Sequence, residues 1–461
     1  MSAERRAGAP VHLPALDGYR GFAALCVTIY HCWLFTDAPL GRGPLRALVA
    51  SLGLGVEMFF VLSGFVLFLP VVRHGGRFGS LRAYARRRAA RIFPAYFVAL
   101  VIQAALAPWL AGVPSPFLGP GGLATFATHL LFLQHETPRW FLHALGWSGP
   151  VMGFGVNGAL WSLSVEVLFY AALPFVAGGF FRHPGRGLAL AVAGGAAWRA
   201  LAWNAPSLAV ATGAATAVGG VVPRLVEQIP GFAGQFACGM AAAWLFAQAA
   251  ALVSAPGGHA DGAAAPGTPG GMAAALDGSL TQDRSPNGSG SAVGAAALQP
   301  GVTQGLAAWV YRHATALVAL GGTALLASLV AAGALGGANG GVYARQLDDL
   351  LPAAAFAVLL LATPLAGSRL ARVASSRVAR WTGDVSYGCF LWHLPLILFF
   401  TNVLGILRGP GDAAFLGLSA VVVPSALGLG WLSRHWVEEP AMAWARTRAA
   451  RRDSGGGTQE R

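Results

Sequence analysis

The chain has 461 residues, of which 55% are hydrophobic and only 11% are charged. Soluble domains carry roughly 25% charged residues, so this composition excludes an ordinary soluble domain. All 31 basic residues are Arg and the formal net charge is +13. Because these Arg residues lie mostly between apolar blocks, where they are typical topology determinants, we expect no nucleic-acid partner.

Taken in chain order, the apolar blocks are long enough to cross a bilayer. A stretch of about 20 mostly apolar residues spans the hydrocarbon core as a helix. The sequence therefore predicts an all-α polytopic membrane protein with about ten transmembrane helices in one bundle. The predicted spans are residues 16–36, 52–72, 92–111, 159–181, 188–203, 231–252, 313–332, 350–366, 384–406 and 413–433.

The distribution of Arg predicts the orientation of these spans. With a cytoplasmic N-terminus, 23 Arg residues fall on the inside, six fall on the outside, and two lie within spans. Positive residues are enriched on the cytoplasmic side of membrane proteins. Both termini are therefore predicted to be cytoplasmic.

Three connecting segments differ from simple loops. Residues 112–158 are predicted to be an outer loop with interfacial helices, and residues 208–222 are apolar but short. Either segment is alternatively a re-entrant piece or contains an extra span, and two extra spans would leave both termini on the same side. Residues 254–307 are dominated by Gly, Ala, Pro and Ser, a composition that cannot bury enough apolar surface to fold. The predicted organisation is an N-terminal helical half, a disordered cytoplasmic loop, a C-terminal helical half and a basic cytoplasmic tail. Their boundaries are 1–252, 253–308, 309–440 and 441–461.

The first span contains three ionisable residues, in the stretch LDGYRGFAALCVTIYH. Arg20 and His31 are eleven residues apart, close to three helical turns, so they share one face at a separation of roughly 16 Å. Asp17 precedes Arg20 by one turn and can pair with it. Ionisable groups inside a membrane are functional or paired within the bundle, and the sequence alone leaves both interpretations open.

Polar residues also accompany the second span. Glu57 lies near its outer end, and Ser63 precedes a glycine, Gly64, that would allow close helix contact. Arg88 and Arg91 follow in RRRAARIFP, one turn apart. They are either topology signals or a binding site for the phosphates of a nucleotide-containing donor, because Arg matches phosphate geometry.

The later spans add further candidates. Trp161 and Glu166 lie in LWSLSVEVLFY, His393 lies in SYGCFLWHLP, and Glu438 follows the last predicted span. Together these residues provide groups for general acid–base chemistry, but proton-coupled transport uses similar groups. The four cysteines show no metal-ligand spacing, and no metal site is expected.

At these residues the chain resembles the acyltransferase-3 family of integral membrane O-acyltransferases. The resemblance rests on six motifs in order across residues 13–440. They are LDGYRG followed by His31, FFVLSGF, RAARIFP, WSLSVEVLFY, SYGCFLWHLP with Phe390 where Tyr is usual, and the closing Glu438-Glu439-Pro440.

The resemblance implies transfer of an acyl group, with acetyl expected, from cytoplasmic acyl-CoA to a hydroxyl of a carbohydrate or glycan. The catalytic residues would be His31, Arg20, Asp17 and Glu166, and the donor phosphates would bind Arg88 and Arg91. Glu57, Ser63, Trp161, His393 and Glu438 would support the substrate or the structure. Acyl-CoA is expected as a substrate, with no permanently bound cofactor, and the bacterial plasma membrane as the location. The alternative is a polytopic transporter or exporter of a glycolipid.

Overall fold

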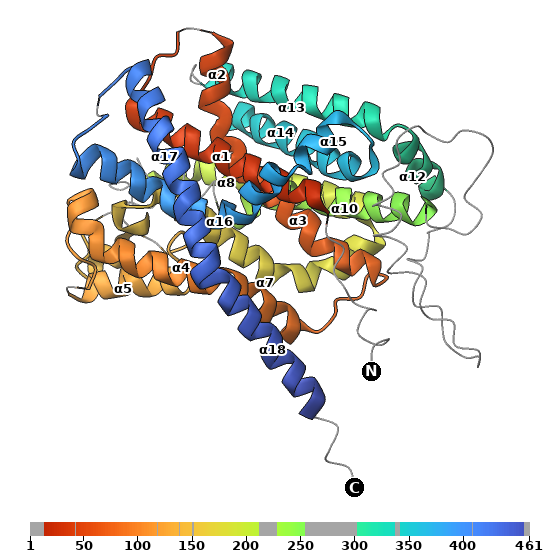
Figure 1. The fold of residues 1–461 in the computed structure, drawn as a ribbon, viewed down its shortest axis with the longest axis horizontal. Coiled ribbons are helices and arrows are strands. Elements are labelled where there is room, and N and C mark those ends of the chain that lie inside the picture. The colour runs from red at the N-terminus through yellow and green to blue at the C-terminus, as the bar shows by residue number, and fades with distance from the viewer. Residues whose placement is uncertain are drawn as a thin grey trace.

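A computed structural model describes residues 13–455, apart from positions 42, 118, 138, 150–151, 212–227, 254–301, 337–341 and 408. Every regular element in this part of the chain is a helix (Figure 1). The fold is therefore all-α, as predicted. The long helices are α1 (Pro14–Thr36), α3 (Gly55–Arg73), α4 (Leu81–Ala111), α7 (Trp161–Arg182), α8 (Pro184–Ala211), α10 (Ala233–Val253), α13 (Ala314–Gly336), α14 (Val342–Ala362), α16 (Arg377–Leu398) and α17 (Asp412–Ser433).

Each predicted span overlaps one of these helices. By length and apolar composition, seven helical stretches of the described chain are able to cross a membrane. This confirms a polytopic membrane protein. The total of ten spans and the cytoplasmic position of both termini stay predictions.

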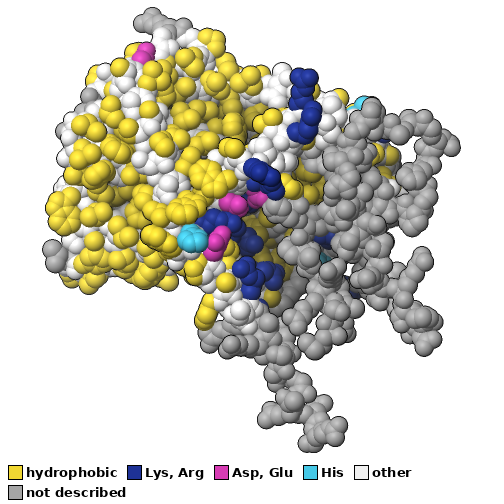
Figure 2. All heavy atoms as spheres, in the orientation of Figure 1, with side chains coloured by type: hydrophobic (Ala, Val, Ile, Leu, Met, Phe, Trp, Pro, Cys, Tyr) yellow, Lys and Arg dark blue, Asp and Glu magenta, His cyan; other side chains and the backbone are white. Residues whose placement is uncertain are grey.

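The surface of the bundle has the character expected of a protein that faces lipid. Phe175 of α7 is 87% exposed, and Leu190 of α8 is 73% exposed. Figure 2 shows hydrophobic side chains over most of one face, with a cluster of charged groups near the start of α18 (Glu439–Gly455) and few others elsewhere on this face. A water-facing helix would carry polar residues at such positions.

Helices from the two halves of the sequence pack together. The first helix, α1, lies along α16, and α16 packs in turn on α17. In the same way α3 lies along α10, which contacts α14 (Figure 1). Residues separated by more than 300 positions therefore meet inside one bundle, and the functional residues of both halves are brought together.

Glycine permits the closest of these contacts. A methyl group added at Gly64 of α3 would lie 2.1 Å from the carbonyl oxygen of Phe236 in α10. A methyl group at Gly383 of α16 would lie 1.9 Å from the carbonyl oxygen of Asp17. Both distances are far below van der Waals contact, so the two crossings need a residue without a side chain. The close contact expected at Gly64 is confirmed.

Two helices extend into segments that were predicted as loops. The N-terminal part of α4 includes residues 81–91, because Ser80 caps the helix by accepting a hydrogen bond from the Ala83 N–H at 3.2 Å. Residues 302–308, assigned from the sequence to the disordered loop, form the first part of α12 (Val302–Arg312). Ala307 and Val310 of this short helix are buried against the bundle. The apolar pattern of this 11-residue helix is too short to be recognised in the sequence as a membrane span.

The other unusual segments are described in part. The predicted outer loop contains two short helices, α5 (Pro120–Leu130) and α6 (Arg139–Ala144), which agrees with the expected interfacial helices. The segment 208–222 is helical up to Ala211 as the end of α8, and its remainder lies outside the described residues. The predicted disorder of residues 254–301 also lies outside them. The C-terminal basic segment begins as α18, which continues from α17 through a π-helical turn at Arg434–Glu438.

Candidate active site

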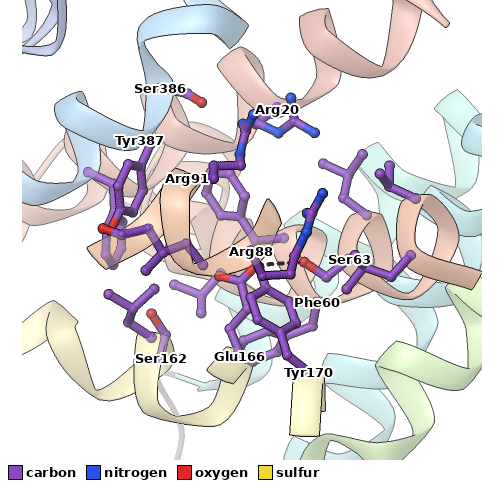
Figure 3. Close-up of a pocket in the computed structure, with 18 residues that line it drawn as sticks. Arg20, Phe60, Ser63, Arg88, Arg91, Ser162, Glu166, Tyr170, Ser386 and Tyr387 are labelled. Carbon is purple, nitrogen blue, oxygen red and sulfur yellow. Dashed lines mark hydrogen bonds between the residues drawn. The ribbon is translucent and has the colours of Figure 1, made fainter. Parts of the chain in front are cut away.

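A cavity of about 90 Å³ lies among α1, α3, α4, α7 and α16 (Figure 3). Three Arg side chains enter it: Arg20 from α1, and Arg88 and Arg91 from α4. The rest of the wall is apolar except for a set of hydroxyl and carboxyl groups. These other polar groups are Ser63, Ser162, Glu166, Tyr170, Ser386 and Tyr387. The three Arg residues, Ser63 and Glu166 were all predicted site residues, and the fold brings them together from four different helices.

The three guanidinium groups give this cavity a positive charge. Arg88 and Arg91 are one turn apart on α4, so both side chains point to the same side of that helix. Arg20 Nη1 donates to Asp17 Oδ1 at 3.0 Å, which confirms the pairing predicted from their spacing. Glu166 contributes a negative charge to the same cavity. Three positive groups beside one acidic lining residue leave the cavity wall with an excess of positive charge.

Two hydroxyl groups hold the carboxylate of Glu166. Ser63 Oγ donates to Glu166 Oε1 at 2.7 Å, and the Tyr170 hydroxyl donates to the same oxygen (Figure 3). The carbonyl oxygen of Tyr170 accepts from the Tyr84 hydroxyl at 3.1 Å. This carbonyl is available because Pro174, four residues later, has no N–H to donate to it. The sequence predicted Ser63 and Glu166 but missed Tyr170, although its position one turn after Glu166 was a usable signal.

A pair of histidines lies farther along α1 and α16. His393 Nε2 is 3.3 Å from His31 Nδ1. His393 Nδ1 is 2.7 Å from the carbonyl oxygen of Phe390, and His31 Nδ1 is 2.9 Å from that of Val27. His393 is completely buried. The partnership of these two predicted residues was not foreseen.

These contacts determine the tautomers of the neutral rings. A carbonyl oxygen only accepts, so Nδ1 of each histidine carries a hydrogen. Nε2 of His393 then carries no hydrogen, and it shares the single Nδ1–H of His31 with the nearer carbonyl oxygen of Val27. The remaining ring nitrogen of His31, Nε2, therefore holds the lone pair. A general base or nucleophile requires such a lone pair.

The histidine pair and the Arg-lined cavity are separate. Among the described residues, neither His31 nor His393 belongs to the cavity wall. Phe390 does belong to it, and the ring centroid of Phe390 is 5.8 Å from that of His393. The hydrogen bonds of Glu166 go to Ser63 and Tyr170, which places this carboxylate with the cavity and not beside His31.

A proline inside α16 determines how the C-terminal part of this helix is held. Pro395 has no N–H, so the carbonyl oxygen of Leu391 lacks its usual helical donor. That oxygen accepts from Gln103 Nε2 and from Asn157 Nδ2, each at 2.9 Å. Both amides are almost completely buried. They connect α16, next to His393, to α4 and to the segment before α7.

The remaining predicted residues surround the site. Glu57 is 8% exposed at the start of α3, and Trp161 stacks on Phe232 with ring centroids 5.5 Å apart. Glu438 is 4% exposed in the π-helical turn and accepts from Ser433 Oγ at 3.1 Å. These residues support the helices around the cavity, and the described contacts give them no direct place in it.

The segment between α4 and α7 is folded around a third histidine, His129. Its Nδ1 is 2.7 Å from the Thr125 carbonyl oxygen, and its Nε2 accepts from the Gly153 N–H at 2.9 Å. Burial lowers the pKa of His129 to about 4. This ring is therefore neutral near pH 7, and its hydrogen bonds tie α5 to the residues before α7.

Comparison with known proteins agrees with this arrangement. A family model described as an acyltransferase domain matches residues 13–434. Acyltransferase MdmB of Streptomyces mycarofaciens is 33% identical over 170 residues, which cover 36% of this chain and 39% of the relative. Protein 2 in the picA locus of Rhizobium radiobacter is 36% identical over 137 residues, which cover 27% of this chain and 65% of the relative.

A third relative, from Bacillus subtilis (strain 168), is named as a candidate peptidoglycan O-acetyltransferase, YrhL. It is 34% identical over 84 residues, which cover 18% of this chain and 12% of the relative. The chain thus spans less than two thirds of the length of each of these relatives. No solved structure matches the chain. Because the family match covers nearly the whole chain and seven described helical stretches are able to cross a membrane, the chain belongs to the acyltransferase-3 family and is a multi-pass membrane protein.

Proposed function

We propose that this enzyme transfers an acyl group, acetyl in the simplest case, from cytoplasmic acyl-CoA to a hydroxyl group of a carbohydrate. One observation carries the proposal. Two helices, α1 and α16, contribute both to the wall of the Arg-lined cavity and to the His31–His393 pair. An anionic donor and a group that activates a hydroxyl are the two requirements of such a reaction.

The Arg-lined cavity is the proposed site for the phosphate groups of CoA. Arg offers a rigid fork of N–H donors that binds phosphate oxygens in a bidentate manner. Arg88 and Arg91 follow the Arg-rich start of α4, which the positive-inside rule assigns to the cytoplasm. Acyl-CoA would therefore enter from the side on which it is made, and the acyl end would point along α16 towards His393 and His31.

His31 Nε2 is the proposed catalytic atom. In direct transfer it accepts the proton of the acceptor hydroxyl while the new C–O bond forms and the C–S bond of the thioester breaks. The departing thiolate then takes the proton from the imidazolium, so free CoA and an ester are the products. The same lone pair would also attack the acyl carbon in a two-step route. His393 supports either route because its Nε2 accepts from His31 Nδ1–H and stabilises the positive imidazolium.

The carbohydrate acceptor is supported by the family resemblance and by the relative whose name refers to peptidoglycan. Glycan acceptors on the outer side would fit the position of His31, near the outer end of α1 in the predicted topology. The bacterial plasma membrane is the proposed location.

Turnover by the purified full chain in lipid nanodiscs tests this function. The protein is supplied with acetyl-CoA labelled in the acetyl group and a panel of glycans and glycolipids. We expect release of free CoA that depends on one of the acceptors, together with label in an ester that mild base removes. Absence of CoA release with every acceptor, or label found only in amides, would contradict the proposal.

A further inference from the structure

The route from the donor cavity to the histidine pair passes one side chain. The residues of α16 on the cavity wall are Ser386, Tyr387 and Phe390, and His393 comes one turn after Phe390. Phe390 is therefore the last cavity residue of α16 before the catalytic pair. It is only 8% exposed, so its ring is enclosed by neighbours.

Those neighbours form an aromatic barrier. The Phe390 ring lies 6.4 Å from the ring of Phe59, in an edge-to-face arrangement with an interplanar angle of 67°. The Phe390 ring centroid also lies 5.8 Å from that of His393. Phe59 and Phe390 are both on the cavity wall, so their contact is the part of the wall that adjoins the histidine pair.

The adjacent wall residue, Phe60, is held more firmly. Its ring centroid lies 4.8 Å from that of Phe232 and 4.9 Å from that of Phe236, and its side chain is 1% exposed. A side chain fixed on this many sides has little room to move aside. Passage of the donor's acyl group from the cavity towards the histidines therefore depends on the contact between the Phe59 and Phe390 rings.

The size of the space matters because acyl transfer needs close approach. The reacting atoms must come within about 3–3.5 Å of each other. The thioester carbon therefore has to reach the barrier, and every further carbon of the acyl chain has to be placed beside the two rings. Phe59 and Phe390 lie on the wall that these carbons would meet, so the room beside the two rings limits the length of the acyl chain.

We propose that Phe390, packed against Phe59, is the residue that sets the acyl-chain length this enzyme accepts and restricts it to short acyl groups. The inference rests on the proposed function, because it takes the Arg-lined cavity as the donor site. It adds a specificity determinant that is neither a catalytic group nor a phosphate ligand. Phe390 and Phe59 act by size alone, since neither side chain carries a polar atom.

The test is a selectivity ratio. The full chain in nanodiscs is supplied with acetyl-, butyryl- or hexanoyl-CoA and one accepted hydroxyl compound, and kcat/KM is measured for each thioester. Phe390→Ala is expected to raise the hexanoyl-to-acetyl ratio at least about tenfold, the lower limit of what one methylene contributes in an apolar pocket. Phe59→Ala is expected to raise it less, because Phe390 remains. Phe390→Trp is expected to lower the butyryl-to-acetyl ratio.

Phe356→Ala is the matched control, because Phe356 is a fully buried Phe of α14 that is not on the cavity wall. The hexanoyl-to-acetyl ratio of kcat/KM in Phe356→Ala should equal that of the wild-type protein. If Phe390→Ala does not fold, Phe390→Leu provides a smaller but measurable shift. An unchanged ratio in a folded Phe390 variant, or an equal shift in Phe356→Ala, would overturn the inference. A wild-type protein that releases no CoA from any thioester would instead show that the proposed function is wrong, and the inference would fail with it.

Discussion

Arg20, Arg88 and Arg91 bring three positive charges to one cavity, and Glu166 is the acidic residue on its wall. Glu166 is already engaged by two hydroxyl groups, and Asp17 engages one side of Arg20. The N–H donors of Arg88 and Arg91 are therefore the strongest candidates to meet an incoming phosphate. Their spacing of one helical turn lets both reach one ligand.

Replacement of these two side chains should weaken donor binding. Arg88→Ala with Arg91→Ala is expected to raise the Kd for acetyl-CoA at least about tenfold, since each hydrogen bond to a charged group is worth about 1.5–3 kcal/mol. Lys at both positions should restore binding only in part, because a point charge loses the bidentate geometry. Calorimetric titration of acetyl-CoA into the nanodisc-embedded protein measures the change. Arg82→Ala with Arg87→Ala, two exposed positions of the same helix, is the control. If the two double variants bind acetyl-CoA with equal affinity, Arg88 and Arg91 do not bind the donor and act only as topology determinants.

The motifs of the sequence identified most residues of the site but not their partnerships. His31, Arg20, Glu166 and His393 were all predicted. The contact between His31 and His393 joins positions 362 residues apart, and it depends on the packing of α1 against α16. The sequence also did not predict the hydrogen bonds to the Leu391 carbonyl, because neither Gln103 nor Asn157 lies in a recognisable motif. Periodicity describes one helix at a time and does not give the register between two helices.

At the scale of the elements, two prolines within helices create connections between helices. Pro174 makes the Tyr170 carbonyl available to Tyr84, and Pro395 makes the Leu391 carbonyl available to Gln103 and Asn157. In a membrane a freed carbonyl has no water to bond, so a neighbouring helix must supply the donor. These prolines therefore determine where α7 and α16 are tied to their neighbours.

A double-mutant cycle tests the anchoring of α16. Gln103→Leu with Asn157→Leu leaves the Leu391 carbonyl buried without these donors, which should cost about 1–3 kcal/mol of stability. In a Pro395→Ala background, the N–H of residue 395 can donate to the Leu391 carbonyl in place of the two amides. The same double replacement should therefore lower the free energy of unfolding by a smaller amount, with a difference of at least about 0.5 kcal/mol. Thermal unfolding in one detergent measures all four proteins. Strictly additive effects would show that Pro395 and the two amides act independently.

The outer segment should respond to pH through His129. Burial lowers the pKa of His129 to about 4, against about 6.5 in an unfolded chain. The folded state therefore binds fewer protons between these values, and its stability is complete above about pH 6.5 and declines as the pH falls towards 4. Protonation would also remove the acceptor of the Gly153 N–H.

Amide hydrogen exchange at Gly153, corrected for the intrinsic effect of pH, provides the measurement. Protection should fall between about pH 6.5 and 4 in the wild-type protein. His129→Gln keeps an acceptor but does not titrate, so its protection should be constant over this range. A wild-type protection factor that does not depend on pH would contradict the assignment.

The elements themselves were mostly predictable. All ten predicted spans are helices, because long apolar blocks leave few alternatives. The N-terminal extension of α4 was missed because residues 81–91 are rich in Arg and fall outside any apolar window. The first part of α12 was missed for a similar reason, since its composition is mixed and its burial depends on neighbours that only the tertiary structure supplies.

At the scale of the whole molecule, the two parts of the site lie at different depths in the predicted topology. Arg20 is near the start of α1 and His31 is near its end, separated by about 16 Å along the axis. With a cytoplasmic N-terminus, the donor cavity is towards the inside and the histidine pair is towards the outside. The bundle would then pass an acyl group, and not the whole acceptor, through the membrane.

Topology labelling tests this arrangement. The four native cysteines are buried, so a single new cysteine can be followed. Ser289→Cys introduces it into the segment predicted to be a cytoplasmic loop, and Ser148→Cys introduces it into the predicted outer segment, where Ser148 is exposed. An impermeant maleimide applied to intact cells should label the Ser148→Cys protein, and it should label the Ser289→Cys protein only after the membrane is opened. Labelling of the Ser289→Cys protein in intact cells would reverse the predicted membrane orientation.

The rate of acyl transfer by His31→Gln bears most directly on the mechanism. Gln keeps hydrogen bonding and approximate size but has no lone pair that can cycle a proton, so it separates a catalytic role from a structural one. We predict a fall in kcat of about 10²–10⁴-fold, with normal membrane abundance and unchanged affinity for acetyl-CoA, because the Arg-lined cavity is intact. Transfer by His31→Gln at a rate near that of the wild-type protein would contradict the catalytic role of His31 and would place the chemistry elsewhere in the bundle.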